Sequence, residues 1–216
     1  MFLQRLLLHE LSLVLLLSKV LATKGEHLNS INTRAECMRK IKLYIASSLD
    51  SYVASDNGGI DWLFSDADYG YAKFYDSIDT ILVGRKTYDQ SLTFDEYPYK
   101  GKKVYVFTHR TEGKKNDNDT QDVEFIDEDI PLFARHLIQQ SSAKKKDIWL
   151  LGGVEIVSIL LNAGLIDEII LSIHPIILGK GIPLFNNIKK QMKLQLQEFI
   201  PFESGLVQLC YCVLKN

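Results

Sequence analysis

Two adjacent glycines, Gly152 and Gly153, stand where a strand is expected to run into a helix. Apolar residues with strand propensity fill 148–151, and apolar residues at helical spacing follow from Val154 onward. Glycine lacks a Cβ atom, so a ligand can approach the backbone, and a helix start presents unpaired N–H groups and the positive end of its dipole. This combination predicts a phosphate-binding turn. The alternative is a plain tight turn, which a pair of glycines on its own favours.

Two more predicted strands end in residues suited to phosphate. Segment 84–87 follows the wholly apolar run 80–83, and segment 108–110 lies at the end of the predicted strand 103–108. These segments supply a glycine, hydroxyl groups and cations: Gly84, Arg85, Lys86, Thr87, Thr108, His109 and Arg110. Because the carboxyl ends of parallel strands share one edge of a sheet, the three junctions together predict a pocket for a polyphosphate cofactor. Taken singly, each basic residue is more often a solvated surface charge.

The elements that must position these junctions follow a clear order. Strands and helices alternate as far as Ile156, and strand then follows strand, which predicts an α/β fold with a mixed sheet, helices on both faces and an antiparallel edge. The helix at 66–77 has Ser65 or Asp66 available as its N-cap. The other predicted elements are strands at 41–46, 123–126 and 166–177, a helix at 131–140, and a hairpin of 192–200 and 206–214.

Composition narrows the classes of partner. The chain has 216 residues, of which 46% are hydrophobic and 24% charged, so it can form one sizeable core. A net charge of −2 supplies no broad positive field for nucleic acid or an acidic membrane, which leaves small molecules as the expected partners. The three cysteines are an odd number and do not indicate a disulfide framework, and no metal-ligand spacing is present.

The first 37 residues differ from the rest of the chain. Their leucine-rich run is interrupted by polar residues and falls short of the roughly 20 apolar residues that span a bilayer. We interpret 1–37 as an extension ahead of a cytoplasmic domain at 38–216. The alternative is an export signal in residues 1–22, ending at Val20-Leu21-Ala22, although Glu10 inside the apolar region counts against it.

The Rossmann fingerprint and the P-loop are both absent, but several motifs occur together in order. They are Tyr44-Ile45-Ala46-Ser47-Ser48-Leu49-Asp50, Val83-Gly84-Arg85-Lys86-Thr87-Tyr88, Leu150-Leu151-Gly152-Gly153, the segment 161–168, and the segment 175–185 that contains Leu178-Gly179-Lys180-Gly181. With these motifs, residues 38–216 resemble the dihydrofolate reductase superfamily, most closely the single-domain proteins similar to the reductase half of the bacterial riboflavin-biosynthesis enzyme. No zinc-deaminase signature accompanies them, so the chain is not the two-domain enzyme.

The resemblance implies a three-layer α/β fold with a central eight-stranded, mixed and mostly parallel sheet, helices on both faces and a C-terminal antiparallel hairpin. It also implies an NADPH-dependent oxidoreductase that transfers hydride to a pteridine- or pyrimidine-type small molecule, and a homodimer formed through the C-terminal strands. A rival from another class is a non-catalytic module that binds NADPH or another nucleotide with the same fold.

Site residues carry over from the resemblance one by one. The phosphates of the cofactor would lie against residues 84–87, and its 2′-phosphate region against residues 108–110. The pyrophosphate and nicotinamide half would meet Gly152, Gly153, Val154 and Glu155, and the carboxamide would meet Ala46.

Two acids are expected on the substrate side. Asp50 lies in the loop over the nicotinamide, where Ser51 follows it instead of the usual glycine. Asp68 stands where related reductases keep the acid that grips the heterocycle, and it is the candidate proton donor, with Asp66 or an ordered water as the rival. Alternatively both acids only favour the helix N-terminus electrostatically. The aromatic rings of Trp62, Tyr97 and Tyr99 either stack on a heterocycle or cover the core.

Overall fold

The computed structural model describes residues 38–109, 122–140 and 146–215. The predicted extension or export signal in residues 1–37 and the site candidate Arg110 lie outside these ranges. Along the part of the chain that is described, none of the helices has the length and apolar character needed to cross a membrane.

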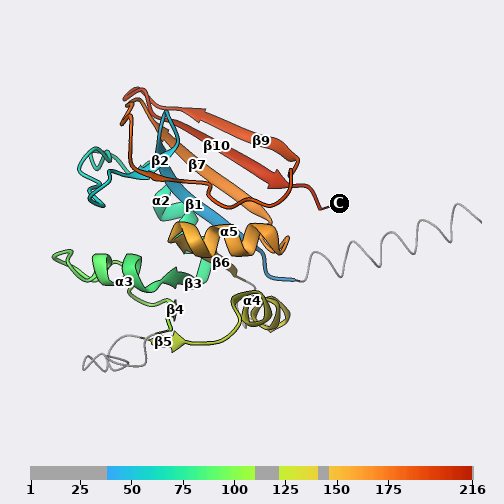
Figure 1. The fold of residues 1–216 in the computed structure, drawn as a ribbon. Helices are drawn as coiled ribbons and strands as arrows, with labels where there is room; N and C mark the ends of the chain where they lie inside the picture. The colour runs from blue at the N-terminus through green and yellow to red at the C-terminus, as the bar shows by residue number, and fades with distance from the viewer. Residues whose placement is uncertain (1–37, 110–121, 141–145, 216) are drawn as a thin grey trace, which may run out of the picture. The chain divides into compact units, whose positions relative to one another are not determined.

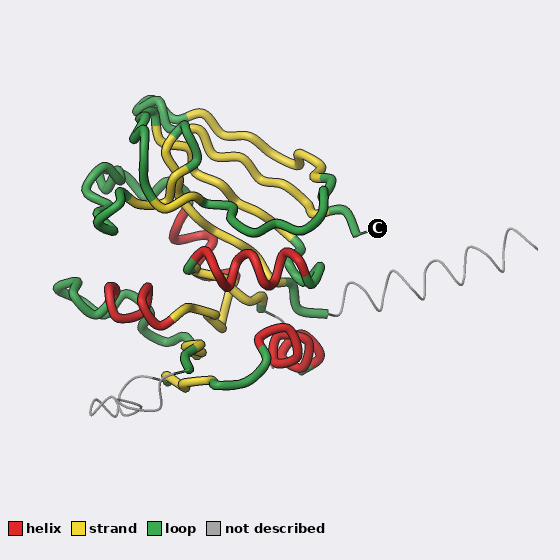
Figure 2. Tube along the Cα trace, viewed as in Figure 1, coloured by secondary structure: helices red, strands yellow, loops and turns green. Residues whose placement is uncertain are grey.

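The core of the domain is one eight-stranded sheet with the strand order β5-β4-β3-β6-β1-β7-β10-β9, which Figures 1 and 2 show from the same side. All pairs from β5 to β7 are parallel, and β10 is antiparallel to both β7 and β9. The strands are β1 (Ile41–Ser48), β3 (Ile78–Gly84), β4 (Lys103–Phe107), β5 (Val123–Ile126), β6 (Asp147–Gly152), β7 (Glu168–His174), β9 (Leu194–Pro201) and β10 (Val207–Val213). The predicted mixed, mostly parallel sheet with a C-terminal hairpin is confirmed.

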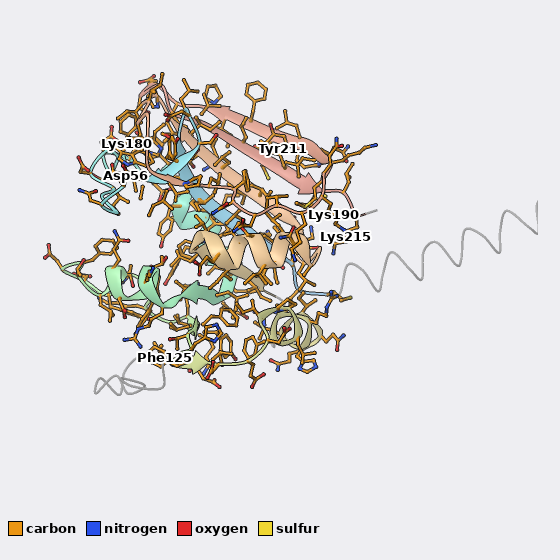
Figure 3. The ribbon with its side chains drawn as sticks, viewed as in Figure 1. Asp56, Phe125, Lys180, Lys190, Tyr211 and Lys215 are labelled. Atoms are coloured by element: carbon orange, nitrogen blue, oxygen red, sulfur yellow. The ribbon has the colours of Figure 1, made fainter. Side chains whose placement is uncertain are left out.

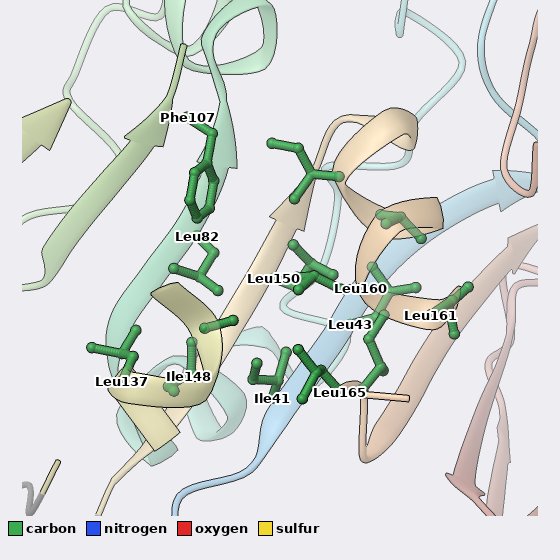
Figure 4. Close-up of a cluster of buried hydrophobic side chains, with 14 of the residues drawn as sticks. Ile41, Leu43, Leu82, Phe107, Leu137, Ile148, Leu150, Leu160, Leu161 and Leu165 are labelled. Carbon is green, nitrogen blue, oxygen red and sulfur yellow. The ribbon is translucent and has the colours of Figure 1, made fainter. Parts of the chain in front are cut away.

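Helices cover both faces of the sheet, as predicted. On one face, α4 (Ile130–Gln139) and α5 (Val154–Asn162) bury side chains such as Leu137 and Leu160 against Leu43, Ile148 and Leu150 of the strands (Figure 4). On the other face, α2 (Tyr71–Ser77) and α3 (Arg85–Ser91) contribute to a separate cluster of aromatic and aliphatic residues. Its buried members are Phe74, Ile78, Ile81, Val83, Tyr88, Tyr99, Val104, Val106 and Trp149. The three layers therefore rest on two separate apolar cores.

The three predicted junctions end on neighbouring strands. In the parallel pair of β3 and β4, Gly84 lies opposite Phe107, and in the pair of β3 and β6, Val83 lies opposite Gly152. The strand ends that carry the candidate phosphate ligands therefore share one edge of the sheet, as open α/β sheets that bind ligands require.

The predicted start of the helix at 66–77 was wrong. Helix α2 begins only at Tyr71, and its N-cap is Gly70, not Ser65 or Asp66. Tyr69 and Gly70 both have positive φ angles, 49° and 78°, which no helical turn can include. The chain thus makes a left-handed turn between the predicted cap and the helix.

Two strand predictions also needed correction. β7 ends at His174 instead of residue 177, because Pro175 has no N–H group to continue the ladder. A small second sheet of β2 (Tyr52–Ala54) and β8 (Ile182–Pro183), which the sequence pattern did not indicate, joins the loop after β1 to the turn after β7. Figure 3 shows Asp56 and Lys180 close together beside this sheet, where their charged groups are 3.3 Å apart.

Candidate cofactor site

The strand-to-helix turn at Gly152 and Gly153 has a backbone that only glycine adopts readily. Gly152 has a φ angle of 137°, and no heavy atom of the described residues lies within 4 Å of the position that its Cβ would occupy. Gly153 is the N-cap of α5, and its carbonyl accepts the first N–H groups of the helix, from Ile156 at 3.0 Å and Val157 at 3.1 Å. A helix leaves the N–H groups before these without an intrahelical acceptor. The turn therefore combines open space at Gly152 with donors at the start of α5.

The second junction packs directly against the first. A Cβ atom on Gly84 would lie 3.1 Å from Ile156 Cδ1 and 3.6 Å from the backbone nitrogen of Gly153. A Cβ atom on Gly153 would in turn lie 3.4 Å from Thr87 Oγ1. Gly84 thus serves close packing between the two junctions, and Thr87 lies beside the glycine turn.

The Arg85 side chain is held in place by two contacts. Its Nε donates to the Asp89 carboxylate at 2.7 Å, and its guanidinium carbon lies 5.1 Å from the centre of the Phe125 ring on β5, a residue labelled in Figure 3. Nη1 of Arg85 is buried and has no hydrogen-bond partner among the described residues. A buried donor without an acceptor costs stability, so the guanidinium retains capacity for an anionic ligand. Lys86 is exposed on the same helix.

The third junction lies at the end of β4, one strand further along the edge. Thr108 is buried, and its backbone N–H donates to the Ile126 carbonyl at 2.9 Å. The His109 side chain is 98% exposed, and its Nδ1 lies 3.1 Å from an Asp127 carboxylate oxygen. The structure therefore brings two of the three predicted residues to the edge, and the third, Arg110, is not described.

Two acidic groups oppose the cations at this edge. Glu155 is exposed in the first turn of α5, close to where a phosphate would meet the helix. Asp89 already neutralises part of the Arg85 charge. An anionic ligand at this edge would therefore depend on the backbone donors as well as on the cations.

Asp50 is engaged with donors from its own chain. Its carboxylate accepts the Ser48 hydroxyl at 2.6 Å and the backbone N–H groups of Leu178 at 3.1 Å and Gly179 at 2.7 Å. The Ser48 hydroxyl and the two amides hold the pKa of Asp50 below its usual value. Ser51 has a φ angle of 68°, so it adopts the left-handed conformation that favours glycine, the residue that the family resemblance leads us to expect there. This carboxylate ties the loop after β1 to the turn after β7.

Asp68 and Asp66 both precede α2. The Asp68 carboxylate accepts the Ala72 N–H at 2.9 Å and remains exposed, while Asp66 accepts the Tyr69 hydroxyl at 2.7 Å. The contact to Ala72 favours a helix-capping role, and the exposure leaves the second Asp68 oxygen open to a ligand. Burial raises the pKa of the Tyr44 hydroxyl, and the charge of Asp68 raises it further. Ala46, the predicted carboxamide contact on β1, is half-buried and lies opposite Ser172 of β7.

The site also contains residues that the sequence did not single out. His174, at the end of β7, is buried, and its Nε2 accepts the backbone N–H of Phe64 at 3.2 Å. The ring of Trp62 lies edge-on to His174 at 5.2 Å, and desolvation lowers the pKa of His174. Trp62 therefore covers the strand end, and Tyr99 is buried in the core. The only local signal for His174 was a lone polar residue at the end of an apolar strand.

Comparison with known proteins identifies the family. The model of the RibD C-terminal domain matches residues 39–208. The chain belongs to this family. The uncharacterized protein YyaP of Bacillus subtilis strain 168 is 39% identical over 188 residues, covering 80% of this chain and 94% of YyaP. YwjB from the same strain, also uncharacterized, is 38% identical over 177 residues, covering 80% of this chain and 97% of YwjB.

Solved structures share the fold of this family. A protein of Shewanella sp. PV-4 named for riboflavin biosynthesis aligns with a TM-score of 0.69 and 26% identity, over 82% of this chain and 99% of that one. A Thermotoga maritima deaminase and 5-amino-6-(5-phosphoribosylamino)uracil reductase aligns with a TM-score of 0.62 and 16% identity, over 82% of this chain and 57% of that one. Enterococcus faecalis dihydrofolate reductase, solved with NADP(H), aligns with a TM-score of 0.58 and 14% identity, over 82% of this chain and 98% of that one. The fold is dihydrofolate reductase-like.

Proposed function

We propose that this protein is an NADPH-dependent reductase that transfers hydride to a pteridine- or pyrimidine-type small molecule. The observation that supports this most is the shared edge of β3, β4 and β6, where a glycine turn, helix donors and the guanidinium of Arg85 lie in a chain of a reductase-like family. Ligands of open α/β sheets bind at such an edge.

The residues present fit NADPH. The position of a Cβ on Gly152 is open with respect to the described residues, so the pyrophosphate can approach the backbone there, beside the N–H groups at the start of α5 that have no intrahelical acceptor. Arg85 keeps a buried Nη1 without a partner among the described residues, beside Thr87 and the exposed Lys86. His109 and Arg110 would meet the 2′-phosphate, which distinguishes NADPH from NADH. When bound, NADPH supplies the hydride.

On the substrate side, the chain itself would supply a proton and a hydrogen-bond acceptor for the heterocycle. Asp68 is exposed at the start of α2 and would hold a ring N–H or deliver a proton to the reduced bond. Asp66 and an ordered water are the rival proton sources, and the Asp66 carboxylate already accepts the Tyr69 hydroxyl. Asp50 would act on the substrate only indirectly, by fixing the loop after β1.

Turnover separates this proposal from its rival. The full chain should oxidise NADPH when it is given a heterocyclic substrate, and the loss of absorbance at ~340 nm measures this. The first substrate to test is 5-amino-6-(5-phosphoribosylamino)uracil, and dihydrofolate and simpler pteridines come next. Asp68→Asn should lower kcat while NADPH binding remains. NADPH binding without turnover across the panel would favour the non-catalytic module, and a chain that binds no NADPH would rule out the reductase and leave only a module for another nucleotide.

A further inference from the structure

The turn that places Asp68 is held by side chains from distant strands. Tyr69 and Gly70, the two residues after Asp68, have φ angles of 49° and 78°. A tyrosine in the left-handed region is uncommon and costs backbone energy, so the surrounding structure must hold it there. The turn then delivers two contacts of Asp68, whose carbonyl accepts the Tyr71 N–H and whose carboxylate accepts the Ala72 N–H, both at 2.9 Å.

One carbonyl oxygen receives both of the donors that hold this turn. The Tyr69 carbonyl lies 3.4 Å from the Tyr44 hydroxyl on β1 and 3.4 Å from Nε2 of Gln208 on β10. Gln208 is only 8% exposed, and its Nε2 is itself oriented by Ser172 Oγ at 3.0 Å. Its Oε1 lies 3.9 Å from the position that a Cβ on Gly70 would occupy. Gln208 therefore lies directly beneath the turn.

The side-chain amide of Gln208 is buried between the sheet and a loop, and burying an amide costs free energy of desolvation. An apolar side chain of similar length would pack there without the desolvation penalty, whereas the amide needs partners for its polar atoms. The acceptors within reach of its Nε2 lie on β7, on β1 and in the turn after Asp68, and the two N–H bonds of the amide can serve Ser172 Oγ and the Tyr69 carbonyl. What the amide adds over an apolar residue is a fixed orientation of the Tyr69 peptide.

We propose that Gln208 and Tyr44 are positioning residues for Asp68: their two donors to the Tyr69 carbonyl fix the left-handed turn that aims the Asp68 carboxylate at the substrate. This inference rests on the proposed function, because it gives Asp68 a role toward the heterocycle. It assigns Gln208 and Tyr44 no contact with substrate or cofactor.

The test uses Gln208→Met and Tyr44→Phe, which remove one donor each and keep the approximate volume. For each variant of the full chain, kcat should fall about tenfold or more, since small misplacements of a reacting group are costly. The KM for NADPH should stay unchanged, because the three junctions that we assign to the cofactor's phosphates end β3, β4 and β6, whereas Tyr44 and Gln208 lie on β1 and β10. Amide hydrogen exchange at Tyr71 and Ala72 should become faster.

Matched controls make the same chemical changes elsewhere. Gln197→Met removes an exposed amide from β9, and Tyr75→Phe removes a hydroxyl that donates to the carbonyls of Pro98 and Lys100. Both should retain the parental kcat and the parental exchange at the start of α2.

The outcomes are distinguishable. Unchanged exchange at Tyr71 and Ala72 in both test variants would overturn the inference, and so would unchanged kcat alongside faster exchange. Faster exchange in a protein that turns over none of the heterocycles would support the role of Gln208 and Tyr44 in holding the turn, and would defeat the proposed function instead. If Gln208→Met does not fold, Tyr44→Phe still decides the question, because it removes the other donor to the same oxygen.

Discussion

Replacing Gly152 with alanine separates a structural role of the glycine turn from a role in binding. At a φ angle of 137° an alanine is strained, and no heavy atom of the described residues lies within 4 Å of its new Cβ, so the cost is backbone strain and not a clash. Strain of this kind costs about 1–3 kcal/mol, which in a chain of this size lowers Tm by roughly 2–12 °C.

The same methyl group would occupy the space that we assign to the pyrophosphate. Gly152→Ala should therefore raise the Kd for NADPH at least tenfold, which corresponds to about 1.4 kcal/mol. Titration of NADPH against the folded variant, followed by fluorescence well below its Tm, measures this.

Gly101→Ala is the matched control. Gly101 has a φ angle of 76°, and a Cβ atom there would likewise have no heavy atom of the described residues within 4 Å, but Gly101 precedes β4, at the opposite end of the strand from the candidate site. Its alanine variant should lose stability and bind NADPH like the parent. Equal NADPH affinity in Gly152→Ala and the parent would refute the assignment of this turn to the cofactor.

Three further predictions concern single positions. Arg85→Ala should weaken NADPH and NADH binding by similar factors, several-fold each, in parallel fluorescence titrations, because both cofactors carry the phosphates that we assign to residues 84–87, and unchanged affinities would argue against a phosphate contact. Gly181→Ala would drive a methyl group into the Ala54 carbonyl and should cost about 1–3 kcal/mol of stability by thermal unfolding, whereas an unchanged Tm would contradict the β2–β8 geometry. The pKa of Asp50 is lowered in the folded chain, so the ionised carboxylate stabilises the fold at pH values above the pKa of the unfolded chain. This stabilisation is lost as the pH falls through the pKa of the folded chain. The Tm difference between the parent and Asp50→Asn should thus shrink as pH falls below about 4, and a constant difference would count against this linkage.

The sequence pattern was sufficient to predict the layers of the fold and the shared edge. The apolar run 80–83 and the residues before Gly152 are strands buried on both faces, and such strands differ clearly from the amphipathic helices between them. Glycine at a strand end is also informative, since the φ angle of Gly152 excludes most other residues.

The substrate side could not be predicted in the same way, because its geometry depends on contacts between distant residues. The start of α2 depends on Gln208, which is 139 positions from Tyr69 along the chain, and no local pattern reports that contact. His174 is similar, since its partner Phe64 lies 110 positions away. The loop around Asp50 likewise depends on amides from the turn after β7.

Direct titration of the full chain with NADPH and with NADH tests the proposed cofactor site most directly. We expect saturable NADPH binding that raises Tm, and NADH binding that is at least tenfold weaker, because we assign His109 and Arg110 to the additional 2′-phosphate. No change in fluorescence or Tm at millimolar NADPH would contradict the proposed function.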